Sequence, residues 1–175
     1  EQYSYENSIG STYFVLVVRN NSDKTVSIRA NTVAKDGNGN IVGAADGSEE
    51  PVGAGQEVCL LHGFFDISDI ADFEYTLYAS ECRYSDSAVQ DLSYTQNMTE
   101  NGAVFQVTNN GREPVEFVEG RALFFSGGRL VYSDSTYFTD DDSELKSGNT
   151  ISKQLEPYVD FDSVQFYLTG RRQTW

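Results

Sequence analysis

Apolar and polar residues alternate along much of this chain, which is the period of a β-strand rather than that of a helix. Val26, Ile28 and Ala30 are separated by polar residues, and the segments 73–79 and 164–168 show the same alternation. Because side chains on a strand change face at every residue, each segment predicts a strand with one buried face. Segment 13–18 is apolar at every position, so we expect a central strand covered on both sides.

Residues that favour turns separate these segments. The runs 36–40 and 126–128 are rich in Gly, Asn, Asp and Ser and predict hairpin tips between apolar strands. Strands at a spacing of about 8–12 residues, joined by such turns, are typical of a β-sandwich. We predict strands over segments 2–6, 12–19, 25–35, 40–46, 56–62, 72–80, 89–95, 102–108, 115–125, 129–135, 149–155 and 163–169.

The sequence contains two similar halves. Val-Arg-Asn-Asn-Ser-Asp-Lys-Thr-Val at 18–26 resembles Val-Thr-Asn-Asn-Gly-Arg-Glu-Pro-Val at 107–115, and Gly-Asn-Ile-Val at 39–42 resembles Gly-Arg-Leu-Val at 128–131. The second copy carries a short insertion, which we expect in a surface loop because loops tolerate added length. Two modules follow, one over 1–83 and one over 84–175, and their short polar linker favours a fixed or semi-fixed pair.

The motifs suggest a family. An apolar strand is followed by Asn-Asn-Ser-x-Lys-x-Val (20–26) and Asp-Gly-x-Gly-x-Ile-Val (36–42), and the second copy carries Leu-Phe-Phe-Ser-Gly-Gly-Arg-Leu-Val (123–131). This arrangement resembles the FxLYD-type Ig-like modules of bacterial surface proteins and lipoproteins, although the first copy departs from it with Val-Ala-Lys-Asp at 33–36. The resemblance implies an all-β fold of two tandem Ig-like β-sandwich domains from an internal duplication, and it brings no catalytic residues.

The charge balance narrows the classes of partner. The chain has 27 Asp and Glu against 12 Lys and Arg, a net charge of −15. Nucleic acids and anionic membrane surfaces would repel it, and we expect neither as a partner. No apolar run is long enough for direct membrane insertion. The acidity serves either solubility or the binding of divalent cations or a basic partner.

Few residues suggest catalysis, a cofactor or a covalent link. His62 is the only histidine and has no nucleophile motif beside it, so a structural or exposed histidine is the main interpretation. Cys59 and Cys82 are candidates for a disulfide if their two strands pair as a hairpin, and otherwise they are two reduced thiols. No cofactor is expected.

Two further groups are candidates for binding. The acidic run Asp140, Asp141, Asp142 and Glu144 is either a solvated loop or a calcium site. The chain has many aromatic residues for two thin cores. They either fill those cores and the contact between the halves, or form an exposed platform for a glycan or a protein partner. The candidates for that surface are Tyr78, Tyr132, Tyr137, Phe138 and Tyr167.

These observations lead to a non-enzymatic exported protein of the cell envelope, acting as a binding, adhesion or spacer module. We expect an extracellular or cell-surface location, with a signal or lipid anchor removed. The alternative is a carbohydrate-binding accessory module that uses exposed aromatics and acidic loops. An enzyme with scattered acidic residues, or assembly through edge strands, is a further alternative. The sequence does not define the protein or glycan partner, or the oligomeric state.

Overall fold

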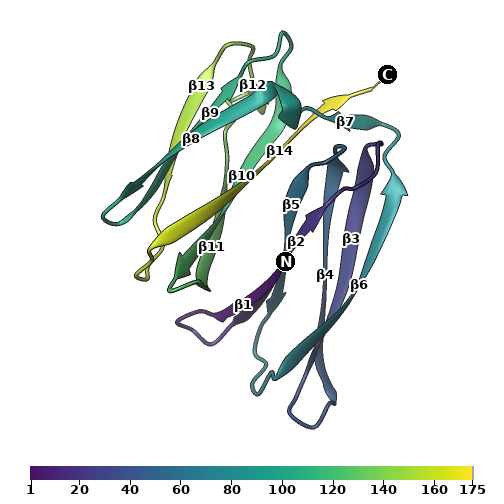
Figure 1. Ribbon diagram of the computed structural model, residues 1–175, viewed down its shortest axis with the longest axis vertical. Coiled ribbons are helices and arrows are strands. Elements are labelled where there is room, and N and C mark those ends of the chain that lie inside the picture. The colour runs from purple at the N-terminus through teal and green to yellow at the C-terminus, as the bar shows by residue number, and fades with distance from the viewer. Residues whose placement is uncertain (175) are drawn as a thin grey trace.

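The computed structural model describes residues 1–174 and shows an all-β fold of several antiparallel sheets (Figure 1). The one helix among these residues is the short 3-10 helix η1 (Val89–Asp91). The strands are β1 (Gln2–Glu6), β2 (Thr12–Arg19), β3 (Val26–Lys35), β4 (Ile41–Val52), β5 (Glu57–Phe64), β6 (Asp72–Glu81), β7 (Ser85–Ser87), β8 (Leu92–Thr99), β9 (Gly102–Asn109), β10 (Val115–Ser126), β11 (Arg129–Tyr137), β12 (Glu144–Leu145), β13 (Thr150–Leu155) and β14 (Ser163–Gln173).

The two halves of the chain build sheets with matching strand order. The first half (residues 1–83) forms sheets β1-β2-β5 and β4-β3-β6. The second half (residues 84–174) forms β8-β9-β13 and β11-β10-β14, with β7 added beside β14. Leaving aside the short strands β7 and β12, each half has six strands. In both halves the first, second and fifth of these strands form one sheet, and the other three form the second sheet. Each half is therefore β-sandwich-like, with two sheets facing each other across a core.

The insertion expected in the second half lies between β11 and β12. In the first half β4 runs on to Val52, which pairs with Val26 at the start of β3. In the second half that pairing is made by the separate strand β12, whose Leu145 pairs with Val115 of β10. The loop 138–143 between them holds Asp140, Asp141 and Asp142 of the acidic run, and Glu144 opens β12. The added residues have thus been accommodated at the surface without changing the order of strands.

Each half has its own apolar core, and a third apolar cluster lies between the halves. The core of the first half has these buried members: Phe14, Leu16, Val26, Ile28, Ala30, Ala34, Val52, Val58, Leu60 and Phe64. The core of the second half has these: Ala88, Ala103, Phe105, Val107, Val115, Val118, Ala122, Phe124, Phe138, Leu145, Leu155, Val164, Phe166 and Leu168. The third cluster, which we call the inter-half cluster, has these: Tyr5, Val15, Val17, Cys59, Leu123, Phe125 and Leu130.

Strand β2 contributes to two of these clusters. Phe14 and Leu16 face the core of the first half, whereas Val15 and Val17 face the inter-half cluster. All four are buried, so the prediction of a strand covered on both sides is confirmed. The result is a stack of four sheets, in which the inner two, β1-β2-β5 and β11-β10-β14, face each other (Figure 1).

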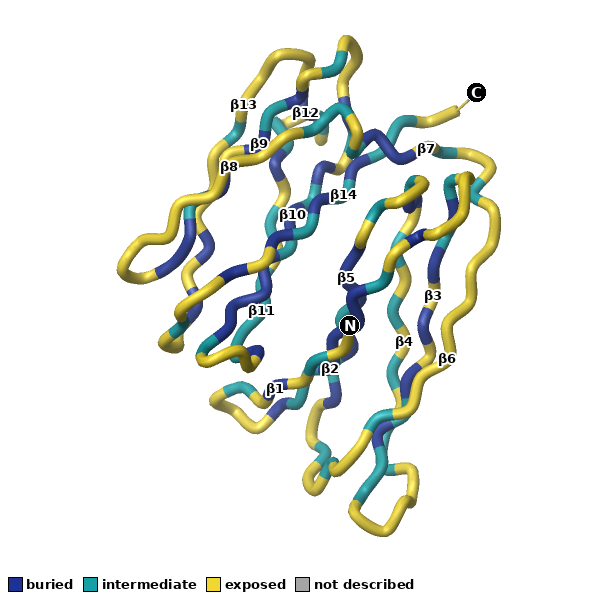
Figure 2. Tube along the Cα trace, viewed as in Figure 1, coloured by how far each residue is buried: buried dark blue, intermediate teal, exposed yellow. Residues whose placement is uncertain are grey.

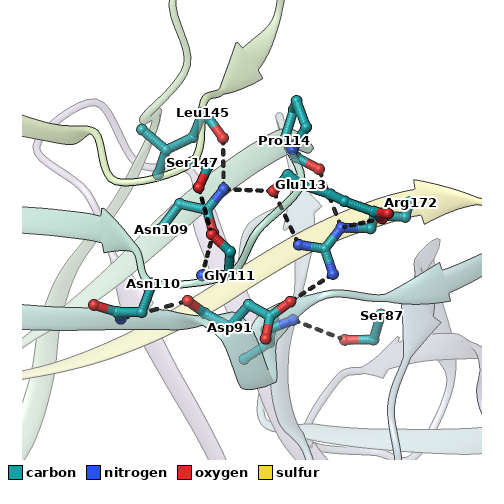
Figure 3. A network of polar contacts seen from close by, with 11 residues as sticks. Ser87, Asp91, Asn109, Asn110, Gly111, Glu113, Pro114, Leu145, Ser147 and Arg172 are labelled. Carbon is teal, nitrogen blue, oxygen red and sulfur yellow. Dashed lines mark hydrogen bonds and ion pairs between the residues drawn. The ribbon is translucent and has the colours of Figure 1, made fainter.

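A polar network closes one end of the second half (Figure 3). The fully buried Asn109 donates from Nδ2 to the carbonyl oxygens of Glu113 at 2.8 Å and Leu145 at 2.9 Å. Beside it, the Arg172 side chain forms an ion pair with Asp91 and donates to the carbonyl oxygen of Glu113 at 3.1 Å. The side-chain amide of Asn109, at the end of β9, therefore bonds the segment just before β10 and the last residue of β12.

The first half has the same device. Asn20 is 5% exposed, and its Nδ2 donates to the carbonyl oxygens of Lys24 at 2.7 Å and Val52 at 3.0 Å. The backbone of Asn20 bonds Gln56 and Gly55, as the backbone of Asn109 bonds Asn149 and Gly148. The first Asn of each Asn-Asn pair thus fills a buried polar position, and its Oδ1 also accepts the backbone N–H two residues on, of Ser22 at 3.0 Å and of Gly111 at 2.9 Å, which forms a turn.

Most expected strands are observed, with informative exceptions. The short strands β7 and β12 were not predicted, because two or three residues show no alternation. β4 extends well beyond the predicted 40–46, because its end at Val52 is buried in the core. On β6 the alternating face is not buried as predicted, since Tyr75 and Leu77 are 42% and 45% exposed.

Candidate functional site

The five candidate aromatics separate into three groups. Phe138 is fully buried in the core of the second half. Tyr132 and Tyr167 are partly buried against the inter-half cluster. Only Tyr78 and Tyr137 are well exposed, at 54% and 53%. They lie on β6 and β11, so the structure does not bring the predicted residues together into one surface.

Tyr137 lies in a cleft between the two halves with a volume of about 270 Å³. The end of β4 supplies Glu49 from the first half, and the facing sheet supplies Phe117, Glu119 and Arg171. An exposed aromatic pair therefore adjoins two carboxylates and a guanidinium. Apart from Tyr137, no sequence pattern pointed to these residues, which come from separate strands and meet only because the halves pack together.

Phe117 has an unusual backbone. Its φ of 48° lies in the left-handed region, which bulky residues rarely adopt. The strand register is irregular between Glu116 and Glu119, and the Phe117 N–H leaves the sheet to donate to the Ser143 carbonyl oxygen at 3.0 Å. The bulge leaves the Phe117 ring 44% exposed, with the Arg171 guanidinium carbon 4.4 Å from its centre. A bulge of this kind re-aims a side chain, here toward the cleft.

The electrostatics of the cleft centre on Glu49. Burial, and after it the nearby Glu119 carboxylate, raise the pKa of Glu49 to about 7 against the opposing effect of Arg121. Arg121 is committed elsewhere, since it donates to Glu119 Oε1 at 3.2 Å and to the Cys59 carbonyl oxygen at 3.3 Å. Glu119 therefore has a fixed cationic partner. In the part of the chain that the structure describes, no cation is hydrogen-bonded to Glu49, which favours the neutral acid.

A second cleft, of about 740 Å³, lies at the junction of the halves. Gln56 reaches across it, since its Oε1 accepts from Ser87 Oγ at 2.7 Å and its Nε2 donates to the Leu168 carbonyl oxygen at 3.2 Å. Tyr94 and Phe166 also line the space. Gln56 thus holds the two halves together at the linker, which the sequence did not indicate.

His62 lies inside the core of the first half. It is 1% exposed on β5, and its ring lies 6.2 Å from that of Phe14. Within residues 1–174 neither ring nitrogen has a hydrogen-bond partner, and burial lowers the pKa of the imidazole. A histidine sealed in this way has no access to a substrate, which fits the structural interpretation.

The disulfide candidate is wrong. Cys59 and Cys82 are both free thiols. The premise failed because β5 and β6 do not form a hairpin: β5 pairs with β2 in one sheet, and β6 pairs with β3 in the other. Cys59 lies in the inter-half cluster, where burial raises its pKa to about 11. Cys82 lies just after β6, with its Sγ 3.4 Å from Ser85 Oγ.

The acidic loop is organised by an internal cation. Lys146 Nζ lies 3.2 Å from Asp140 Oδ2 and 3.3 Å from Asp142 Oδ2. Asp140 also accepts the backbone N–H of Asp142 at 3.1 Å. Across residues 1–174, no group of three or more His, Cys, Asp and Glu side chains is placed to hold a metal ion, and this includes the candidates Asp141 and Glu144. The calcium alternative therefore gains no support from the geometry.

Comparisons with known proteins leave the family open. No protein-family model matches the chain, and no curated protein matches it. Among solved structures, a Bacteroides uniformis beta-glucuronidase matches with 14% identity and a TM-score of 0.28, over 94% of this chain and 26% of that one. A putative beta-galactosidase from Bacteroides fragilis matches with 14% identity and a TM-score of 0.20, over 92% of this chain and 27% of that one. This chain thus spans only about a quarter of those proteins, and TM-scores this low carry no argument about activity.

The described residues include no helix with the length and apolar character needed to span a bilayer.

Proposed function

We propose that this protein is a non-enzymatic, fixed pair of Ig-like β-sandwiches that arose by internal duplication, the first over 1–83 and the second over 84–175. We propose that it serves as a binding, adhesion or spacer module of the cell envelope, outside the cell. The observation that carries the proposal is the inter-half cluster, which joins two facing sheets through fully buried side chains such as Val15 and Leu123. An apolar interface of this kind opposes free motion of two modules.

Two observations support the duplication and the absence of catalysis. The matched strand order and the matching buried side chains of Asn20 and Asn109 are what copies of one module would share. The sole histidine, His62, is 1% exposed, so it cannot serve as an accessible base. FxLYD-type modules remain the family we propose on the sequence motifs.

Small-angle scattering of wild type and Leu123→Glu tests the fixed pair. Leu123 is buried in the inter-half cluster and belongs to neither core, so a charge there should separate the halves while each stays folded. We expect one compact shape for wild type and a larger radius of gyration for the variant. Arg129→Glu, at an exposed position of the same sheet, should leave the wild-type profile unchanged. A wild-type profile that requires an ensemble of orientations would contradict the proposal.

A second candidate is a carbohydrate-binding module, and the cleft beside Glu49 favours it. Sugars bind through stacking on exposed aromatic rings and hydrogen bonds to carboxylates, and the cleft offers Phe117, Tyr137 and Glu119 together. A glycan array read with wild type and Tyr137→Ala would test this role. Tyr78→Ala is the matched control, because Tyr78 is equally exposed on the remote strand β6. Silence of wild type on all glycans, or equal loss in both variants, would eliminate the cleft as a glycan site.

A further inference from the structure

Five aromatic rings form a continuous row, which we call the aromatic row, across both halves of the protein. Their order is Phe65, Tyr13, Tyr5, Tyr132 and Tyr158, and the centres of neighbouring rings lie 5.9, 5.1, 6.5 and 6.5 Å apart. The first three rings belong to the first half and the last two to the second half. The aromatic row is therefore complete only when the two halves pack together.

Strand pairing aligns the part of the aromatic row that lies in the first half. Tyr5 of β1 lies directly opposite Tyr13 of β2, and Tyr13 lies opposite Gly63 of β5. Directly opposed residues share a face of the sheet, so the Tyr5 and Tyr13 rings stack, with 15° between their planes. The Phe65 ring fills the space beside Gly63, since a Cβ on Gly63 would come within 2.5 Å of Phe65 Cζ. This face of the sheet is the one that meets the second half.

The contact between the halves extends the aromatic row. β1 and β11 lie side by side where the halves meet (Figure 2), and the Tyr5 hydroxyl is hydrogen-bonded to Ser133 Oγ at 2.8 Å. Tyr132 precedes Ser133 on β11, and Tyr158, from the loop between β13 and β14, lies edge-on against it with 87° between the ring planes. The two ends of the row are open to solvent, since Phe65 is 58% and Tyr158 90% exposed.

A cleft of about 270 Å³ opens beside the middle of the aromatic row, and Tyr5, Tyr13 and Tyr132 line it. This volume lies just below the range of pockets that hold drug-sized ligands, so the cleft fits one small ring-shaped unit. The row continues beyond the cleft to Phe65 in one direction and to Tyr158 in the other. A ligand made of repeated small units would therefore fill the cleft and contact further rings on both sides.

The polar side chains that line this cleft can both donate and accept hydrogen bonds. Asn7 Oδ1 accepts the backbone N–H of Ser11 at 2.9 Å, so its Nδ2 remains a donor for a ligand. Asp134 Oδ1 accepts the backbone N–H of Ser135 at 2.8 Å, so its Oδ2 remains an acceptor, and Ser135 adds a hydroxyl. Sugars match this combination, because their C–H faces stack on aromatic rings while their hydroxyls both donate and accept.

The charges around the cleft narrow the class of sugar. Asp134 and the net charge of −15 repel uronic acids and sulfated sugars. Arg121 also lines the cleft, but it already donates to Glu119 and to the Cys59 carbonyl oxygen. An uncharged sugar chain is therefore the ligand that the lining favours.

We propose that the aromatic row and its cleft bind a neutral, elongated glycan that contacts both halves of the protein. The fixed packing of the halves presents the rings as one preformed surface, which lowers the entropy lost on binding. The inference rests on the proposed binding role. It assigns a ligand class to a site that shares no aromatic residue with the cleft beside Glu49.

Affinity electrophoresis in gels that contain dextran, xylan, mannan or mixed-linkage β-glucan provides the first test, with polygalacturonate as the charged comparison. We expect at least one neutral polysaccharide to retard the protein and polygalacturonate to have no effect. Tyr158→Ala removes an exposed ring with little effect on folding and should weaken binding at least fivefold. Tyr84→Ala is the matched control, because Tyr84 is 83% exposed outside the row and its loss should leave binding unchanged.

Calorimetric titration with oligosaccharides of two to six units, cut from the polysaccharide that retards the protein, provides the second test. Affinity should rise with chain length, because each added unit reaches a further ring of the row. Phe65→Ala and Tyr158→Ala lie at opposite ends of the row and in different halves, so each should reduce this gain at least fivefold. Affinity that does not depend on chain length would contradict a site shared by both halves.

Three other results would overturn the inference. The first is no retardation by any neutral polysaccharide, whether or not polygalacturonate or poly-L-proline binds. The second is equal binding by Tyr158→Ala and wild type. The third is loss of binding in Tyr137→Ala alone, which would move the glycan to the cleft beside Glu49. None of these results changes the scattering profile, so the fixed pair of modules is judged separately.

Discussion

Replacing Glu49 by Gln should stabilise the protein at neutral and alkaline pH. Glu49 lies at the cleft between the halves, and the pKa of its carboxyl is raised to about 7 by burial and by the Glu119 carboxylate. Glutamine has nearly the shape of the neutral acid and never ionises. Arg121 keeps Glu119 as its hydrogen-bonded partner in the variant, so no buried charge is left unpaired.

The magnitude follows from the two pKa values of Glu49. The unfolded chain loses this proton near pH 4.5 and the folded protein near pH 7. Between these values the folded state binds more protons, so the free energy of unfolding decreases as pH rises through the window. At about 1.4 kcal/mol per pKa unit, the full window corresponds to roughly 3 kcal/mol, which is an upper bound because water still reaches part of the side chain.

Urea denaturation at pH 5 and pH 8 measures this effect. Relative to wild type, Glu49→Gln should gain little at pH 5 and about 1–3 kcal/mol at pH 8. His62 acts with the opposite sign, because its lowered pKa costs stability as the pH falls, but it is present in both proteins and cancels in the difference. Glu100→Gln, at an exposed turn, serves as the charge-matched control and should give a difference independent of pH. Equal curves for Glu49→Gln and this control would refute the reasoning.

Three further predictions concern other parts of the molecule. Asn109→Ala should lower the free energy of unfolding by about 1–3 kcal/mol, because it removes the side-chain donor to the buried Leu145 carbonyl oxygen and one of the two side-chain donors to the Glu113 carbonyl oxygen; thermal melting would show it. In thiol labelling at neutral pH, Cys82 should react promptly and Cys59 only on unfolding. A protein that takes up no label and whose mass is lower by two hydrogen atoms would contradict the free thiols. Millimolar calcium should leave Tm unchanged, because Lys146 already pairs with Asp140 and Asp142 in the acidic loop, and a rise in Tm would show a cation site.

The sequence predicted the strands well because alternation and turn chemistry are local signals. The unbroken apolar run in β2 even indicated a strand covered on both faces, although not what covers each face. The disulfide prediction failed because it depended on which strands pair in a sheet, and no local signal reports that. Whether β5 and β6 join as neighbours or lie in opposite sheets depends on the pairing of the whole sandwich, which spacing between cysteines does not contain.

Most residues that line the candidate cleft could not be predicted from the sequence, for a related reason. Glu49, Phe117 and Arg171 belong to three strands and come together only through the contact between the halves. Aromatic content pointed to surplus rings, and it correctly allowed that some of them, such as Tyr132, lie between the halves. The positive φ that exposes Phe117 leaves no trace in composition or periodicity, because it arises from a bulge in the β10–β14 pairing.

The double coverage of β2 has a practical consequence for anyone who wishes to study one half alone. A fragment ending near residue 83 would keep the apolar core of the first half, but it would expose Tyr5, Val15 and Val17 to water. Such a fragment should aggregate or dimerise unless these positions are first replaced by polar residues.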